Sequence, residues 1–272
     1  MKIKNPLFRI AASIATFGFT VTILSACASS ESTPEAHATP TVSMTATSVA
    51  KDEDSAWSLV VLGDSLVAED YSILPELYAA HIEEDQGVEV EINNQGVGGQ
   101  TCKNLLPNVK KYAHYRTPIQ GADVILISLG GGDLLVVGDT YFRGDCGGTD
   151  GDECLREALA EFQANWDDFL TEITSLTTPA DTLIRVIITG SFYDEFQDKV
   201  GTEKYETWAN FQDEFYTYQM QTCEAYDISF LDLYHFDEPE GFRLSDNIHV
   251  TNEGETIIAE MLRDLGYEHA QP

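Results

Sequence analysis

Basic side chains are scarce in this chain of 272 residues. Its 15 Lys and Arg stand against 46 Asp and Glu, which gives a formal net charge of −31 at pH 7. Such a charge repels the phosphates of nucleic acids and of anionic lipid surfaces, so we expect neither as a partner. Because the acidic residues are spread along the chain, they indicate a solvated surface. Apolar residues make up 43% of the chain, which is enough for a sizeable core.

Motifs for metals and cofactors are also lacking. The five cysteines include no Cys-x-x-Cys pair, which argues against a zinc site and against thioredoxin chemistry. There is no His-Glu-x-x-His, and Gly96, Gly98 and Thr101 do not fit the dinucleotide fingerprint. The acidic segment 139–154 could bind calcium, but its acids are not spaced as in a calcium-binding loop. We therefore expect no metal and no cofactor.

The first residues are typical of a bacterial lipoprotein signal. A basic start precedes the weakly polar stretch 10–24, and Leu24-Ser25-Ala26-Cys27 resembles a lipobox. An ordinary secretory signal or a short membrane anchor are the alternatives. We expect a signal peptide over residues 1–26, a lipid on Cys27 that anchors the protein to a membrane, and an extracytoplasmic location. Residues 27–55 are rich in Ser, Thr, Ala and Pro and are typical of a disordered linker.

Four cysteines remain if Cys27 carries the lipid. An even number in an oxidising compartment favours disulfides, and four cysteines allow three pairings. We prefer Cys146 with Cys154, which would close a Gly-rich loop, together with Cys102 with Cys223.

From residue 56 to about 268, apolar β-branched runs alternate with helical patterns. The expected strands are 57–63, 88–93, 124–128, 183–189 and 228–233, and the expected helices are 72–84, 101–112, 155–176, 203–225 and 251–265. Strands that alternate with helices indicate βαβ units and a parallel sheet. The sequence therefore predicts one α/β domain, a three-layer αβα sandwich around a five-stranded, mainly parallel sheet.

Gly-rich loops follow the first three expected strands. They are Gly63-Asp64-Ser65, residues 94–101 and Gly130-Gly131-Gly132-Asp133. The carboxyl ends of parallel strands share one edge of a sheet, so we expect these loops to converge there. Glycines in such loops let backbone N–H groups turn towards a ligand. Ser65 could instead cap a following helix.

Asp246 lies three residues before His249, just ahead of the last expected helix. Such a carboxylate can turn back to accept the imidazole Nδ1–H, which leaves Nε2 free to take a proton from a hydroxyl. With Ser65 at the same edge and backbone donors between them, these residues fit acyl transfer. Taken singly, His249 could be a surface His and Asp246 a turn residue.

The ordered blocks of the chain resemble the SGNH (GDSL-type) hydrolase family over about residues 57–265. The nucleophile block matches Gly63-Asp64-Ser65-Leu66, and the last block, Asp-x-x-His, matches Asp246 and His249. The second block, Asn-x-x-x-x-Gly-x-Thr, matches Asn94, Gly99 and Thr101. The resemblance implies a flavodoxin-like sheet.

It also implies a role for each matched residue. Ser65 would be the nucleophile, His249 the general base and acid, and Asp246 its orienting partner. The backbone N–H groups of Ser65 and Gly99 would face the oxyanion. The third block departs, because Gly132 stands where the family has an Asn that also donates to the oxyanion. Such a donor contributes about 2.7–4 kcal/mol to transition-state stabilisation. Either a backbone N–H or water near Gly132 replaces it, another side chain does so, or the enzyme is slow.

Together these features predict a monomeric serine esterase that acts through an acyl-enzyme. Short-chain acyl or acetyl groups on small esters or glycans are the expected substrates. One alternative is a domain of the same fold that binds acylated glycan without turnover, and another is an O-acyltransferase of envelope polysaccharide. An α/β-hydrolase is disfavoured because Val67 stands where its elbow motif has a second Gly.

Overall fold

The computed structural model describes residues 56–190, 192–194 and 197–269. The expected signal peptide, Cys27 and the linker lie outside these residues. Within the described ranges, no helix combines the length and the apolar character needed to cross a membrane.

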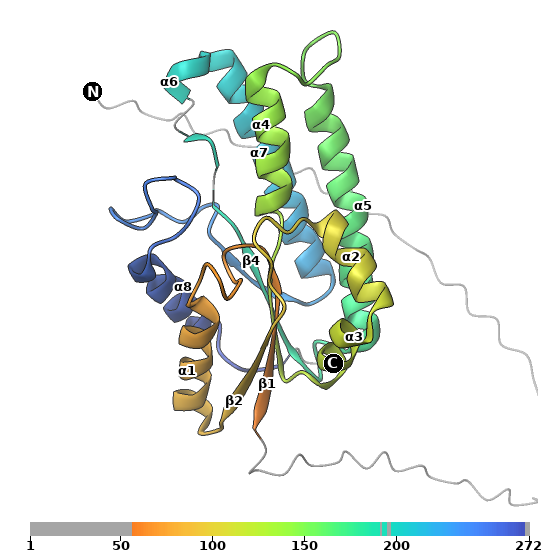
Figure 1. Ribbon diagram of the computed structural model, residues 1–272, viewed down its shortest axis with the longest axis vertical. Coiled ribbons are helices and arrows are strands. Elements are labelled where there is room, and N and C mark those ends of the chain that lie inside the picture. The colour runs from red at the N-terminus through yellow and green to blue at the C-terminus, as the bar shows by residue number, and fades with distance from the viewer. Residues whose placement is uncertain (1–55, 191, 195–196, 270–272) are drawn as a thin grey trace, which may run out of the picture. The chain divides into compact units, whose positions relative to one another are not determined.

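Five parallel strands form the centre of the fold (Figure 1). In chain order they are β1 (Trp57–Gly63), β2 (Val90–Asn94), β3 (Val124–Ser128), β4 (Leu183–Ile188) and β5 (Ser229–Asp232). Their order in the sheet is β2-β1-β3-β4-β5, and every neighbouring pair is parallel. The predicted α/β class and strand pattern are confirmed. The chain leaves β1 towards β2 on one side and later returns to β3 on the other, so the order reverses beside β1, where open α/β sheets bind ligands.

Helices cover both faces of the sheet because successive strand residues point to opposite sides and both sets are apolar. Val60 and Leu62 of β1 belong to one buried cluster, and Leu59 and Val61 belong to the other. The helices α1 (Leu74–Gln86) and α8 (Asn252–Asp264) pack on one face. The other side holds α2 (Cys102–Lys111), α3 (Ala113–Gly121), α4 (Gly131–Arg143), α5 (Glu153–Leu176) and α7 (Thr202–Ala225). A short helix, α6 (Gln197–Val200), precedes α7.

Three segments differ from the sequence-based prediction, and one of them is the short helix α6, which was not expected. Residues 113–121 form α3, which was not expected, and the expected polar insertion 139–154 is shorter because α4 continues to Arg143. Only the stretch between α4 and α5 is a loop, and the predicted disulfide between Cys146 and Cys154 closes it.

The second predicted disulfide is wrong. Cys102 and Cys223 are both free and buried. Cys102 begins α2 and Cys223 lies in the last turn of α7, and both helices pack against α5. A free Cys in such a position behaves as a small apolar residue, and burial raises the pKa of both thiols.

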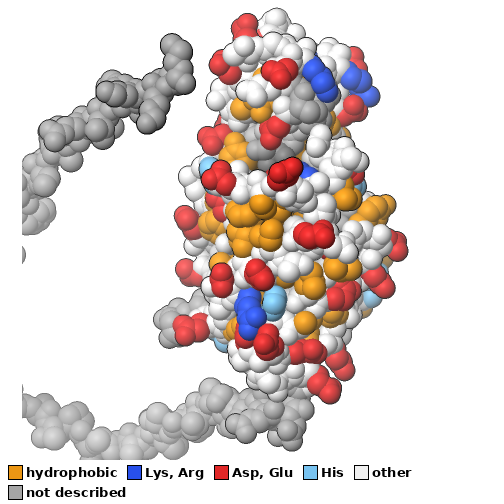
Figure 2. All heavy atoms as spheres, turned by 90° about the vertical axis from the view of Figure 1, so that its left-hand side faces the viewer, with side chains coloured by type: hydrophobic (Ala, Val, Ile, Leu, Met, Phe, Trp, Pro, Cys, Tyr) orange, Lys and Arg blue, Asp and Glu red, His pale blue; other side chains and the backbone are white. Residues whose placement is uncertain are grey.

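Acidic side chains are scattered over the face seen in Figure 2, where basic ones are few. This distribution fits the solvated acidic surface expected from the sequence.

Candidate active site

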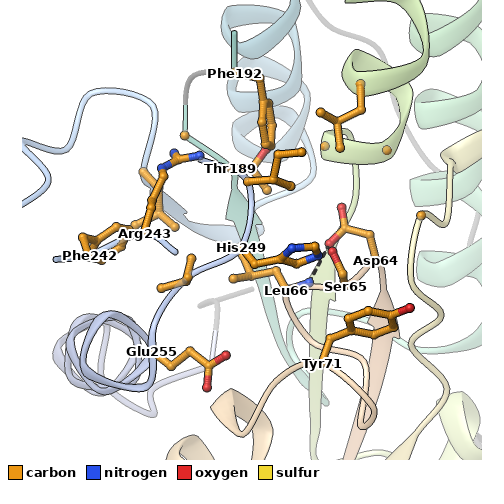
Figure 3. Close-up of a pocket in the computed structure, with 18 of the residues that line it drawn as sticks. Asp64, Ser65, Leu66, Tyr71, Thr189, Phe192, Phe242, Arg243, His249 and Glu255 are labelled. Atoms are coloured by element: carbon orange, nitrogen blue, oxygen red, sulfur yellow. Dashed lines mark hydrogen bonds between the residues drawn. The ribbon is translucent and has the colours of Figure 1, made fainter. Parts of the chain in front are cut away.

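A pocket opens at the carboxyl ends of β1 and β3. It encloses about 640 Å³, including the open space at its mouth. Ser65, Gly99, Gly132 and His249 all line it, so four loops that are distant in the sequence meet there (Figure 3). The structure thus brings together the nucleophile, base and oxyanion positions that the sequence predicts.

The end of β1 turns sharply at Gly63. A Cβ on Gly63 would lie 2.1 Å from the carbonyl oxygen of Ser128 in β3, so no side chain fits between the two strands. The Asp64 N–H donates to the same carbonyl at 2.9 Å. This turn carries Ser65 into the pocket. Ser65 does not cap a helix, because α1 begins only at Leu74.

Asp64 is buried beneath this turn. Its Oδ1 accepts hydrogen bonds from the Leu66 N–H at 3.2 Å and from the Ser128 hydroxyl at 3.0 Å. Burial raises the pKa of Asp64 to about 6, although these bonds and one from the Gly132 N–H act in the opposite direction. Asp64 therefore connects the nucleophile loop to β3 and to the start of α4.

The predicted contact between Asp246 and His249 is present. Asp246 Oδ2 lies 2.8 Å from His249 Nδ1, and Asp246 Oδ1 accepts the backbone N–H groups of Ile248 and His249 at 2.9 and 3.0 Å. The hydrogen bond to His249 is the main reason that the pKa of Asp246 falls to about 2, so this carboxylate is ionised at neutral pH. A carboxylate on Nδ1 leaves Nε2 as the ring nitrogen available for proton transfer.

A second Asp-x-x-His pair has nearly the same internal geometry. Asp232 Oδ2 lies 2.7 Å from His235 Nδ1, and Asp232 Oδ1 accepts the His235 N–H at 3.1 Å. Neither Asp232 nor His235 lines the pocket that contains Ser65. This pair was not among the site residues predicted from the sequence.

Tyr71 was also missed by the sequence analysis. Its ring stacks on His249, with centroids 5.7 Å apart and planes 10° from parallel (Figure 3). Both rings line the pocket. No sequence pattern could have indicated this contact, since Tyr71 lies in an irregular loop before α1.

Two of the three predicted oxyanion donors are free to donate a hydrogen bond. Within the described part of the chain, the backbone N–H groups of Ser65 and Gly99 have no hydrogen-bond acceptor, and both residues line the pocket. The Gly132 N–H differs, because it donates to the Asp64 carboxylate. Backbone N–H groups that converge on one pocket can stabilise a developing negative charge.

Gly132 is closely packed. A Cβ at this position would lie 2.4 Å from the carbonyl oxygen of Gln100 and 3.2 Å from that of Gly99. The loop after β2 therefore occupies the space in which an Asn side chain would begin. The backbone around Gly132 thus leaves no room for the side-chain donor that this position lacks.

The other matched residues hold the loops. The Asn94 side-chain amide donates to the Val67 carbonyl at 2.8 Å and accepts the Gly96 N–H at 2.9 Å. This connects the loop after β2 to the segment after Ser65. Thr101 caps α2, because its hydroxyl accepts the Asn104 N–H at 3.2 Å.

The third block contributes one more connection. Asp133 Oδ2 accepts the Cys102 N–H at 3.0 Å, which joins α4 to the first turn of α2. Burial raises the pKa of Asp133 to about 7.

A metal site is not evident in the described residues: no group of three or more His, Cys, Asp or Glu is arranged to hold an ion. In the acidic loop, Asp150 forms a salt bridge with Arg156 at 2.9 Å. The hydrogen bond from Arg156 lowers the pKa of Asp150 to about 2. The arrangement around Ser65 can instead support nucleophilic attack with proton transfer.

Comparison with known protein families gives one match. Residues 59–262 fit the family described as GDSL-like Lipase/Acylhydrolase. No curated protein sequence is similar enough to count as a match.

Solved structures share the fold. A lipase from a goat rumen metagenome has 22% sequence identity and a TM-score of 0.63, and the match covers 78% of this chain and 98% of that one. An acetylxylan esterase from Geobacillus stearothermophilus has 17% identity and a TM-score of 0.56, with 80% and 98% covered. An extracellular lipase from Streptomyces rimosus has 18% identity and a TM-score of 0.55, with 77% and 99% covered. At these identities the likeness concerns the fold.

Proposed function

Because this chain belongs to the GDSL-like lipase/acylhydrolase family and is an ester-hydrolysing enzyme, we propose that it is a serine esterase with Ser65 as nucleophile. His249 is the general base and acid in this proposal, and Asp246 orients it. The observation that carries the proposal is that Ser65 and His249 line one pocket together with the unoccupied N–H groups of Ser65 and Gly99.

The reaction proceeds in two steps. His249 Nε2 takes the hydroxyl proton while Ser65 Oγ attacks the ester carbonyl carbon, and the resulting oxyanion accepts hydrogen bonds from the N–H groups of Ser65 and Gly99. Collapse of this intermediate breaks the bond to the alcohol, which leaves with the proton from His249. Water then attacks the acyl-enzyme with His249 again as base, and the acid and free Ser65 are released. Ionised Asp246 stabilises the imidazolium in both steps.

We propose short-chain acyl or acetyl esters, small or attached to glycans, as the substrates. The pocket wall carries the apolar side chains of Leu66, Leu135 and Ile248 beside a few polar groups, as is usual in sites for small ligands. The acetylxylan esterase among the solved structures with this fold acts on substrates of that class, as its name states.

We also propose that the enzyme is a monomeric, extracytoplasmic lipoprotein anchored through Cys27. The lipobox-like sequence is the basis of this proposal. The disulfide between Cys146 and Cys154 supports an oxidising compartment, where such bonds persist.

Replacement of the nucleophile tests the proposal. We expect Ser65→Ala to lower kcat/KM for p-nitrophenyl acetate by at least about 10³-fold and to abolish labelling by a fluorophosphonate probe. Ser175→Ala, an exposed Ser on α5, is the control and should keep both properties. Hydrolysis by Ser65→Ala at the rate of the control would exclude Ser65 as nucleophile. A wild-type protein that hydrolyses esters but is not labelled would indicate that the nucleophile is not an activated Ser.

A further inference from the structure

The segment between β5 and α8 forms a short hairpin. Arg243 and Val250 pair as an isolated antiparallel bridge. The Leu244 N–H donates to the His249 carbonyl at 2.8 Å, and the Thr251 N–H donates to the Phe242 carbonyl at 2.9 Å. Asp246 and His249 therefore lie at the tip of a hairpin whose base is fixed by its own ladder.

The tip contains an unusual backbone conformation. Asn247, between Asp246 and His249, has a φ of +58°, in the left-handed region that Gly adopts most readily and Asn more readily than most other residues. This turn directs the side chains of Asp246 and His249 towards each other, as their 2.8 Å contact requires. The Arg243 guanidinium donates from Nη1 to the Asn247 carbonyl at 3.1 Å, inside the hairpin.

Arg243 is itself held in place. Its Nε donates to the two carboxylate oxygens of Glu238 at 3.0 and 2.7 Å, and its side chain is only 15% exposed. The guanidinium lies 5.6 Å from the centroid of the Phe192 ring. Figure 3 shows Arg243 pointing from the hairpin towards Phe192 and Thr189 at the pocket wall.

The contacts of Arg243 decide between two roles for its side chain, which are binding of an anionic substrate and support of the hairpin. An Arg that recognises an anionic substrate needs its fork of N–H donors open to the pocket. Here Glu238 occupies the Nε and Nη2 edge, and Nη1 meets the Asn247 carbonyl. The ion pair is neutral as a whole. Both side chains line the pocket and the guanidinium faces the Phe192 ring, but the hydrogen bonds of Arg243 are made within the hairpin and its base.

We propose that Arg243, held by Glu238, is a positioning residue for His249. Arg243 fixes the Asn247 carbonyl and thereby the left-handed turn that sets the Asp246–His249 pair against Ser65. This inference rests on the proposed catalytic role of His249.

The test compares Arg243→Gln and Glu238→Gln with a matched ion pair elsewhere. We expect each variant to lower kcat by about 10²-fold with KM changed less than about threefold, because misplacement of a catalytic group by about 1 Å costs that much. Arg243→Lys keeps the charge and a donor group, so it should recover part of the loss. The double variant should be no slower than Arg243→Gln alone.

Arg263→Gln is the matched control. Arg263 forms the same forked contact with Asp85, but on the surface between α1 and α8. We expect it to keep the wild-type kcat. Circular dichroism and thermal melting identify any variant that does not fold. If Arg243→Gln does not fold, the kinetics of Glu238→Gln test the inference in its place.

Three outcomes would overturn the inference. They are a wild-type kcat in both test variants, an equal loss in Arg263→Gln, or a rise in KM at constant kcat, which would assign Arg243 to substrate binding. An active Ser65→Ala protein would instead refute the proposed nucleophile. The two failures can therefore be distinguished.

Discussion

Gly132 shows how one residue changes the proposed oxyanion site. A Cβ at this position would meet the carbonyls of Gln100 and Gly99, and the Gly132 N–H is directed to Asp64. A side-chain donor at this position would need the loop after β2 to move. Since that loop carries Gly99, the gain of one donor would displace another.

We therefore expect Gly132→Asn to lose activity, although it introduces the residue typical of the family. Gly132→Ala should lower the free energy of unfolding by about 1–3 kcal/mol, because the new Cβ meets backbone that must shift. Urea unfolding and kcat/KM for p-nitrophenyl acetate measure both effects. Gly121→Ala is the control, since a Cβ at Gly121 meets nothing within 4 Å. A Gly132→Asn enzyme faster than wild type would contradict this account of the packing.

Asp246 permits a second test at the residue scale. We expect Asp246→Asn to lower kcat by about 10³–10⁴-fold, because the amide can favour the wrong imidazole tautomer and does not stabilise the imidazolium. Asp232→Asn removes a carboxylate that makes the same contact with His235 but lies outside the pocket, so it should leave kcat unchanged. Steady-state kinetics on the two variants decides the matter. Equal kinetics in both would remove Asp246 from the proposed mechanism.

Strands and helices whose residues are buried at regular spacing could be predicted from the sequence. The strands β1, β3 and β4 are mostly buried on both faces, and α5 and α7 bury residues at helical spacing. The spacing of their apolar residues follows directly from the faces that they bury. The predicted ends differ from the observed ones by one or two residues in most cases, since helix ends depend on capping contacts.

Two helices could not be predicted for physical reasons. The first turn of α4 contains Gly131 and Gly132, which favour loops, and the helix is stabilised by Leu134, Val137 and Tyr141 in the core. Helix α3 contains Pro118 and only one fully buried residue, so it has no amphipathic pattern. In both cases tertiary packing overrides local preference.

The same distinction applies to the candidate site. The Asp246–His249 contact is local, so the spacing of the two residues was enough to predict it. The Tyr71–His249 stack and the Arg243–Glu238 pair depend on how irregular loops meet, and such loops carry no periodic signal. The absence of a disulfide between Cys102 and Cys223 likewise depends on the packing of α2 and α7.

At the scale of the whole molecule, two buried carboxylates make stability depend on pH. Burial raises the pKa of Asp64 to about 6 and that of Asp133 to about 7, from 3.8 for an exposed Asp. The folded state therefore binds more protons than the unfolded state between about pH 4 and 7. By linkage, these groups stabilise the fold fully only below pH 4, and that stability is lost as the pH rises through their folded pKa values.

We expect the free energy of unfolding to fall between pH 5 and 7, by at most about 1.4 kcal/mol per pH unit for each group. Asp133→Asn should flatten this dependence because it removes one titrating group, provided its amide oxygen accepts the Cys102 N–H. Urea unfolding at several pH values between 5 and 8 measures the slopes. Asp264→Asn, at an exposed position on α8, should leave the slope unchanged. An unchanged slope in Asp133→Asn would show that Asp133 is ionised throughout this range.

The two Asp-x-x-His pairs bear on the recognition and design of active sites. A template search that scores only the geometry of a carboxylate and an imidazole would return both pairs from this chain, with distances of 2.7 and 2.8 Å. Four consecutive residues suffice to build either pair, so its shape carries little information about catalysis. The residues around His249 distinguish its pair from the pair at His235. They are a Ser at the end of β1 and free N–H groups on a shared pocket wall. A designer who grafts the short motif alone would copy the part of the site that this chain already makes twice.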